Sequence, residues 1–195
     1  MSTYAQIFTK NQYDLTKMVR QSQAWFEQEA RLIKSQGRVQ AYYLMRTGAS
    51  QNRPVVTPGE MYMFYYDAKH KDTLPYWDRF PLVFPFSKVK GGFLGLNLHY
   101  LPYHLRARLL DALMDFKTDT RLDDKTKLEF SWKTISAAAK YSPAKACVKH
   151  YLDDHVKSQF KKVDSDNWAT AILLPVSQFQ GAREQQVWQD SMNKI

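Results

Sequence analysis

The sequence predicts an α+β fold, in which a small, bent antiparallel sheet is flanked by helices. The first observation is a change in hydrophobic period. Apolar residues recur at helical spacing before Pro58, alternate along strand-like runs from Pro58 to Tyr100, and return to helical spacing after Pro102. The second is that the strand-like runs carry large aromatic side chains on both faces, as in strands covered on both sides. The third is composition, because 44% of the 195 residues are apolar, enough to build a core.

Residues 1–53 predict an N-terminal helical arm. A helix over residues 15–34 is indicated by the spacing of Leu15, Val19, Ser22, Phe26, Ala30 and Ile33. Gly37 stands where a C-terminal cap is expected, and a shorter helix follows over residues 39–46. The segment 47–58 has the composition of a linker. We therefore expect residues 54–195 to form a separate α+β domain.

The first part of that domain is a β block over residues 58–100. Strands are expected at 60–66, 80–86 and 93–99, with a long polar loop at 67–79 and a tight turn before the third strand. Pro81 and Pro85 confine the second strand to a sheet edge or to bulged positions. This chain order is that of a small Src-homology-type barrel, although the number of strands does not decide whether the sheet closes.

A helical insertion is expected over residues 102–160. Its elements are helices at 102–116 and 143–155, and between them a short strand that passes into an Ala-rich helix at 128–141. Pro102 suits the first turn of one helix, and Ser142 followed by Pro143 suits the start of the other. The chain then closes with residues 165–191, which predict a strand at 168–174 and a last helix that ends near Ser191.

The net charge of +9 is unevenly distributed along the chain. Residues 1–53 and residues 101–162 each carry a net charge of +5, whereas residues 54–100 carry +1 and residues 163–195 carry −2. Two basic helical regions beside a nearly neutral β block suggest a surface that faces a polyanion such as double-stranded DNA. The predicted phosphate contacts are Lys17, Arg20, Arg31, Lys34, Arg106 and Arg108. Solubility, or contact with an acidic protein partner, is the alternative.

No residue pattern indicates catalysis, a metal site or a cofactor. The pairs His99 with His104 and His150 with His155 do not have the spacing of zinc ligands, so we expect surface or capping histidines. The carboxylates Asp67, Asp72 and Asp78 are scattered over a loop of ordinary turn composition, rather than held for two-metal chemistry. We therefore expect neither an enzyme nor a bound metal.

Aromatic residues beside cations raise a further possibility, stacking on single-stranded nucleic acid. The aromatic residues are Tyr62, Phe64, Tyr66, Tyr76 and Trp77, and the cations are Lys69, Lys71 and Arg79. Aromatic residues in alternating strands are more often part of a core, so a place in the core is favoured over stacking on nucleic acid. We accordingly expect Trp77, Phe80 and Phe86 to be architectural.

The sequence also bears on location. No apolar run is long enough to span a bilayer, and residues 1–26 do not resemble a secretory signal. Cys147 is the only cysteine, so it cannot form an internal disulfide, which is typical of a protein made in a reducing cytosol. We expect Cys147 to be a buried structural thiol in a helix, and we expect no membrane partner.

Three segments carry a resemblance to known proteins. The segment PGEMYMFYYDAKHKDTLPYWDRFPLVFPF, followed by GGFLGLNLHYLP, resembles virion proteins of large contractile-tailed bacteriophages, as does the ending VWQDS. The resemblance extends from about Ala24 to Ser191. Among these proteins the chain is most similar to the DNA end protector, a head-completion protein, while a baseplate or neck component is the main alternative.

The resemblance implies a minor structural protein of the virion, made in the host cytoplasm. Such a protein would act on packaged DNA ends or at the head-tail junction, with other virion proteins, in a symmetric multi-copy assembly. The resemblance implies no catalytic residues. A DNA-binding protein and a purely structural baseplate or neck assembly protein both fit, and salt-sensitive DNA binding by the isolated protein separates them.

Overall fold

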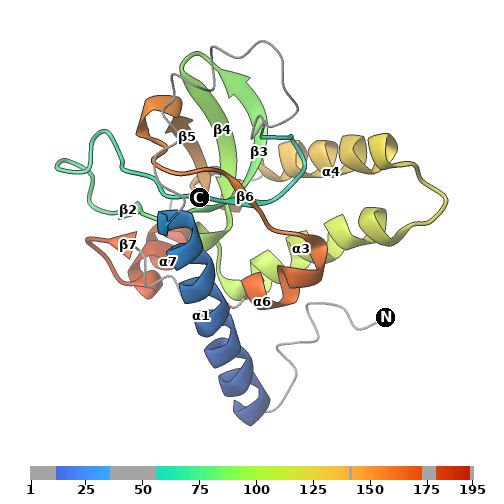
Figure 1. Cartoon of the computed structure of the whole chain (residues 1–195), viewed down its shortest axis with the longest axis horizontal. Helices are drawn as coiled ribbons and strands as arrows, with labels where there is room; N and C mark the ends of the chain where they lie inside the picture. The colour runs from blue at the N-terminus through green and yellow to red at the C-terminus, as the bar shows by residue number, and fades with distance from the viewer. Residues whose placement is uncertain (1–11, 36–55, 141, 173–178, 194–195) are drawn as a thin grey trace.

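The computed structural model describes residues 12–35, 56–140, 142–172 and 179–193. Its centre is a five-stranded antiparallel sheet with the strand order β5-β4-β3-β1-β6, and a separate two-stranded sheet pairs β2 with β7. Figure 1 shows helices on several sides of the larger sheet. The predicted α+β class is confirmed. The five-stranded sheet is open, so the Src-homology-type barrel does not form.

The strands are short except for the central pair. They are β1 (Tyr62–Met63), β2 (Trp77–Asp78), β3 (Leu82–Val89), β4 (Gly92–Asn97), β5 (Val148–Leu152), β6 (Lys161–Lys162) and β7 (Phe179–Gln180). The predicted strands at 80–86 and 93–99 correspond to β3 and β4. The predicted strand at 60–66 is reduced to β1 and an isolated bridge from Tyr66 to Val156.

The hairpin of β3 and β4 accounts for one proline and two glycines of the β block. β3 is not an edge strand, and its register with β4 shifts between Pro85 and Ser87, so Pro85 borders a bulge, which was the second of the two predicted settings. The turn contains Gly91, whose φ of 75° favours glycine. A Cβ on Gly92 would lie 1.9 Å from the carbonyl oxygen of Tyr151, so β5 can pair closely with β4 only because residue 92 is glycine.

Successive side chains of the sheet point to opposite faces, and they pack in two hydrophobic cores, one on each face. Leu82, Phe84 and Leu96 belong to the larger core, in which the Phe84 ring meets the Trp168 ring edge to face at 5.6 Å. Val83 belongs to a smaller, mostly aromatic core with Phe64, Tyr66, Phe93 and Tyr151. The sheet is therefore covered on both faces, as the sequence predicted. Of the three aromatic residues expected to be architectural, Phe80 is fully buried, and Trp77 and Phe86 are half-buried.

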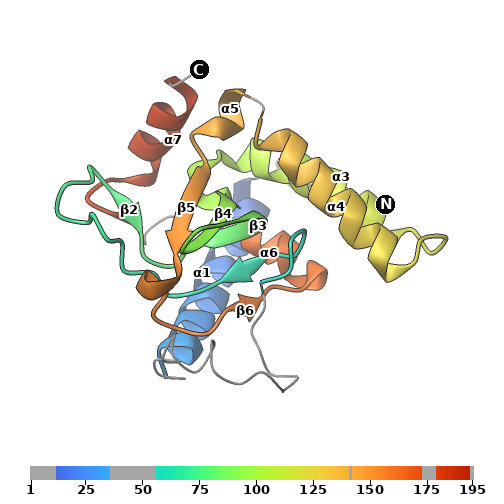
Figure 2. The same ribbon diagram turned by 90° about the horizontal axis from the view of Figure 1, so that it is seen from above.

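The helices surround this sheet. They are α1 (Gln12–Ser35), α3 (Tyr103–Thr118), α4 (Asp124–Ala138), α5 (Ser142–Lys145), α6 (Trp168–Ile172) and α7 (Glu184–Asn193), with short 3-10 turns at Leu98–Tyr100, Asp153–His155 and Ser165–Asn167. α3 and α4 lie side by side (Figure 2). Asp123 begins α4 by accepting a hydrogen bond from the backbone N–H of Thr126 at 2.7 Å. The predicted helices at 15–34 and 102–116 are confirmed as α1 and α3.

Three predicted elements are wrong. Residues 128–141 do not begin with a strand, because α4 is continuous from Asp124 to Ala138. The helix predicted at 143–155 stops after the four residues of α5, and the chain continues as β5, where it satisfies the outer edge of β4. The strand predicted at 168–174 begins as the helix α6. Short apolar runs fit either a buried strand or a buried helix, so period alone could not separate them.

Some predictions lie outside the described residues. These are the helix at 39–46 and most of the linker at 47–58. The last helix is present as α7, but it begins only at Glu184, because Phe179 and Gln180 form the strand β7. The division into an arm over residues 1–53 and a domain over residues 54–195 therefore stays a prediction. Within the described ranges, no helix is long and apolar enough to cross a membrane.

Cys147 provides a test of the core. It is fully buried between α5 and β5, rather than within a long helix, and burial raises the pKa of its thiol from 9.0 to about 12. Between these values the folded thiol stays protonated while the unfolded thiol ionises, so the free energy of unfolding should fall as pH rises above about 9. Urea unfolding at neutral and at alkaline pH measures this fall. Between the two pH values, the free energy of unfolding should decrease less for a Cys147→Ala variant than for the wild type. Equal losses would contradict this assignment.

Candidate nucleic-acid interface

The exposed cations predicted on the first helix lie away from its packed face. Met18 and Trp25 pack against the larger core, and the Ser22 hydroxyl donates a hydrogen bond to the carbonyl oxygen of Thr170 in α6 at 2.7 Å. Residues three and four apart share a helix face, so these three residues define the buried side of α1. The side chains of Lys17, Arg20 and Arg31 are exposed.

Two features qualify that basic surface. Arg31 lies 3.5 Å from Glu27, but both side chains are largely exposed, so the pair contributes little. Lys34 belongs to α1, while its side chain is outside what the structure describes. α6 contacts both α1 and α3, which places the two basic helices on either side of one short element (Figure 1).

The two arginines of α3 have different environments. Arg108 is exposed, as predicted. Arg106 is fully buried, so the prediction that it contacts DNA phosphates is wrong for this structure. The buried stripe of α3 consists of Arg106, Ala107, Leu110 and Leu113, so Arg106 lies on the face that packs against the core. The spacing of Arg106 from Leu110 and Leu113 was the available signal.

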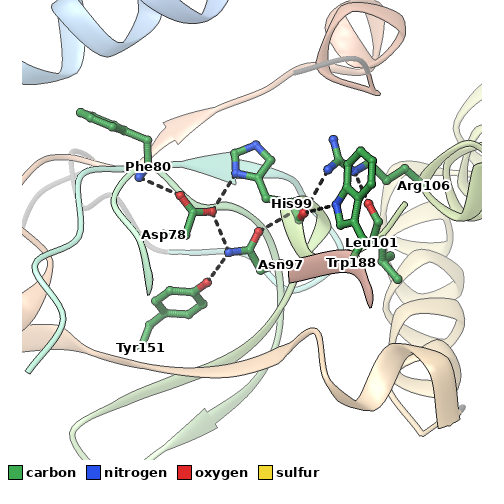
Figure 3. A network of polar contacts seen from close by, with 8 residues as sticks. All are labelled: Asp78, Phe80, Asn97, His99, Leu101, Arg106, Tyr151 and Trp188. Atoms are coloured by element: carbon green, nitrogen blue, oxygen red, sulfur yellow. Dashed lines mark hydrogen bonds and ion pairs between the residues drawn. The ribbon is translucent and has the colours of Figure 1, made fainter. Parts of the chain in front are cut away.

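Arg106 instead connects α3 to the turn that follows β4 and to the helix α7 (Figure 3). Its Nε donates to the carbonyl oxygen of Leu101 at 2.7 Å, and its Nη2 donates to that of His99 at 3.0 Å. The guanidinium also lies 5.0 Å from the ring centroid of Tyr103 and 5.5 Å from that of Trp188. Burial lowers the pKa of Arg106 to about 10, so it remains charged at neutral pH.

Next to Arg106 lies a buried polar network (Figure 3). The Asp78 carboxylate accepts from the Phe80 N–H at 3.1 Å and from the Asn97 amide at 3.0 Å, and it pairs with His99 Nδ1 at 2.7 Å. The same Asn97 amide donates to the Tyr151 hydroxyl at 3.0 Å. The network ties β2 to the end of β4 and to β5.

The network corrects the expectation that His99 is a surface or capping residue, because His99 is fully buried. Its Nε2 has no hydrogen-bond partner in the part of the chain that the structure describes. His104 and His150 are exposed, and His155 Nδ1 bonds to the carbonyl oxygen of Asp67 at 2.8 Å. No spacing in the sequence links Asp78 with His99, so this pair could not have been predicted.

A cavity of about 570 Å³ lies between the segment that precedes β2 and the strand β5. Its aromatic lining is Tyr66, Tyr76, Trp77, Tyr100 and Tyr151, and its basic lining is Lys69, His70, Lys149 and His150. Lys149 Nζ lies 4.0 Å from the centroid of the Tyr100 ring. Asp78 of the buried network also lines the cavity, so the cavity lies directly beside that network.

The aromatic residues that were considered for stacking fall into two groups, those buried in the core and those that line this cavity. Tyr62 and Phe64 are buried in the protein, as the alternative held. Tyr66, Tyr76 and Trp77 line the cavity. Among the cations considered with them, Lys69 lines the cavity and is exposed, Lys71 pairs with Asp67 at 2.9 Å, and Arg79 lies 5.9 Å from the Trp77 ring centroid.

The carboxylates considered for metal chemistry do not converge. Asp78 is committed to the buried network, Asp67 pairs with Lys71, and Asp72 is exposed. Across the described ranges, no group of three or more His, Cys, Asp or Glu side chains could hold a metal ion.

A basic α+β protein with exposed cations on helices and an aromatic cavity with a basic rim has the features expected of a nucleic-acid-binding protein. The family model described as "Phage T4 terminal DNA protecting protein" matches residues 9–193. Because the match covers nearly the whole chain, the protein belongs to this family. The resemblance to a phage DNA end protector is thereby confirmed. No curated protein matches the chain, and no solved structure does.

Proposed function

We propose that this protein binds the ends of double-stranded phage DNA and shields them. The observation that carries the proposal is the family match over residues 9–193, because the family is described by its protection of terminal DNA. The proposal includes no catalytic step. Binding is through the phosphate backbone, without sequence preference, because exposed arginines and lysines on helices recognise charge rather than base edges.

The proposed phosphate contacts are Lys17, Arg20, Arg31, Lys34 and Arg108. Three of these side chains are exposed on α1, opposite the face that packs on the core, and Arg108 is exposed on α3. Arg106 is removed from the set because it is buried. With about five contacts, the logarithm of affinity should fall with a slope of about −4.5 against the logarithm of salt concentration.

We place the protein in the virion, near the packaged DNA end at the head-tail junction, with other virion proteins as neighbours. This part of the proposal rests on the family and on the resemblance to head-completion proteins. A multi-copy symmetric arrangement belongs to the same proposal. A protein of the neck or baseplate that makes no DNA contact is the competing account of the positive charge.

A titration of the isolated protein with linear and circular duplexes, at low and moderate salt, tests the proposal. We expect tighter binding to the linear duplex and a steep loss of affinity with salt. Equal affinity for both forms would retain DNA binding and reject the claim about ends. Absence of binding even at low salt would leave the structural assembly protein as the better account.

A further inference from the structure

We infer that the aromatic cavity beside β5 holds an unpaired nucleotide at the DNA end, with the base against the aromatic floor and the phosphate at the basic rim. This inference rests on the proposed function, since it names the part of a DNA end that the protein recognises. The cavity is separate from the exposed cations of α1, which contact only the duplex backbone in that proposal.

The size and lining of the cavity fit a nucleotide. Its volume of about 570 Å³ lies within the range of small-molecule pockets, roughly 300–1,000 Å³. Aromatic rings accept any base by stacking, so an aromatic lining suits a DNA end of arbitrary sequence. A base inside a duplex is already stacked on both faces, whereas an unpaired terminal nucleotide offers its base without the loss of a base pair.

The aromatic floor is held in place before any ligand binds. The Tyr151 hydroxyl accepts a hydrogen bond from the amide of Asn97, and the Tyr66 hydroxyl accepts one from the backbone N–H of Leu152 at 3.3 Å. Tyr76 packs near Tyr100, with ring centroids 6.1 Å apart. Burial raises the pKa of Tyr100 and Tyr151 well above the usual value, so both hydroxyls stay neutral. A rigid floor reduces the entropy lost on binding.

Charge sets the orientation of the nucleotide. Asp78 is a buried part of the lining, and its carboxylate is already engaged by Phe80, Asn97 and His99, so the groups that engage it are not available to a phosphate there. Lys69 and His70 are exposed, so they form a solvent-facing part of the lining, in the segment before β2. The base therefore enters first, and the phosphate remains at the rim.

The experiment compares a short blunt duplex with the same duplex carrying a single-nucleotide overhang. The overhanging base is a fluorescent adenine analogue whose emission is quenched by stacking, and a second duplex carries the analogue at an internal position. We expect the wild-type protein to prefer the overhang and to quench only the terminal analogue. Trp77→Leu should weaken overhang binding by about 5- to 100-fold and leave blunt-end binding unchanged.

Matched control variants exist elsewhere on the chain. Trp132, in α4, is 40% exposed and does not line the cavity, so Trp132→Leu should bind both duplexes as the wild type does. Lys69→Glu should lose the preference for the overhang. Lys90 is also an exposed lysine, in the β3–β4 turn, and Lys90→Glu should keep that preference. Lys69→Glu also carries the test if Trp77→Leu melts at a lower temperature than the wild type.

The outcomes separate the two proposals. Binding to blunt and overhanging ends with equal affinity, without terminal quenching, would overturn the cavity assignment and leave the proposed function intact. Equal effects of Trp77→Leu and Trp132→Leu would do the same. Failure of the wild-type protein to bind any of the duplexes would overturn the proposed function, and the cavity assignment with it.

Discussion

Reversing the charge of Lys17 and Arg20 together is expected to lower the salt dependence of DNA binding from a slope of about −4.5 to about −2.7, with a loss of affinity at every salt concentration. Each cation that contacts a phosphate releases a condensed counterion, so two lost contacts remove about two ions from the equilibrium. Both side chains are exposed on the outer surface of α1, so the fold should be unaffected. The measurement is a binding titration of the Lys17→Glu/Arg20→Glu variant over a series of salt concentrations.

The matched control reverses Lys88 and Lys90. Both are exposed cations of the β3–β4 hairpin, within the region of nearly neutral net charge. Because two cations are replaced by two glutamates in each case, the change in total charge is the same as in the test variant. We expect this control to shift affinity slightly through the overall field and to leave the slope close to that of the wild type. If both variants changed the slope equally, the first helix would not be a specific DNA-binding surface.

Replacing Arg106 by Ala is expected to lower the free energy of unfolding by about 3 kcal/mol, because two hydrogen bonds from a buried charged group are lost and the carbonyl oxygen of Leu101 loses this donor. Its neighbour Arg108 is exposed, so Arg108→Ala should change stability by no more than about 0.5 kcal/mol. DNA binding should show the opposite pattern, with a slope reduced by about one only in Arg108→Ala.

Urea unfolding and salt titration of both variants measure these expectations. If Arg106→Ala does not fold, Arg106→Lys replaces it, since a lysine keeps the charge but not the geometry that reaches both carbonyl oxygens. A stable Arg106 variant with weakened DNA binding would return Arg106 to the set of phosphate contacts and contradict its role in holding Leu101 and His99.

The elements with a clear hydrophobic period were predictable. The helical stripe through Val19 and Ser22, and the bulge that accommodates Pro85, both have local causes, and both are present. The two segments predicted as the wrong type of element, 143–155 and 168–174, failed for one physical reason. Val148–Leu152 pairs with β4, and Trp168 packs on Phe84, so partners distant in the sequence decide whether these short apolar runs become strand or helix.

The candidate site was predictable only in part. The exposure of Lys17, Arg20 and Arg108 follows from their spacing relative to apolar residues, whereas Arg106 occupies the buried stripe. The aromatic lining from Tyr66 to Trp77 was visible as a local cluster, but Tyr100 and Lys149 join it only through the fold. The pairing of Asp78 with His99 has no local signal, because it arises where β2 meets the end of β4.

The most direct test of end protection is the rate at which an exonuclease degrades an end-labelled linear duplex in the presence of the purified protein. We predict that the protein slows degradation from the ends at low salt. Protection should disappear at salt concentrations that abolish binding, and it should be weaker for the Lys17→Glu/Arg20→Glu variant than for the Lys88→Glu/Lys90→Glu control. An unchanged rate of degradation, under conditions where the protein is bound to the same duplex, would contradict the proposal that this protein shields DNA ends.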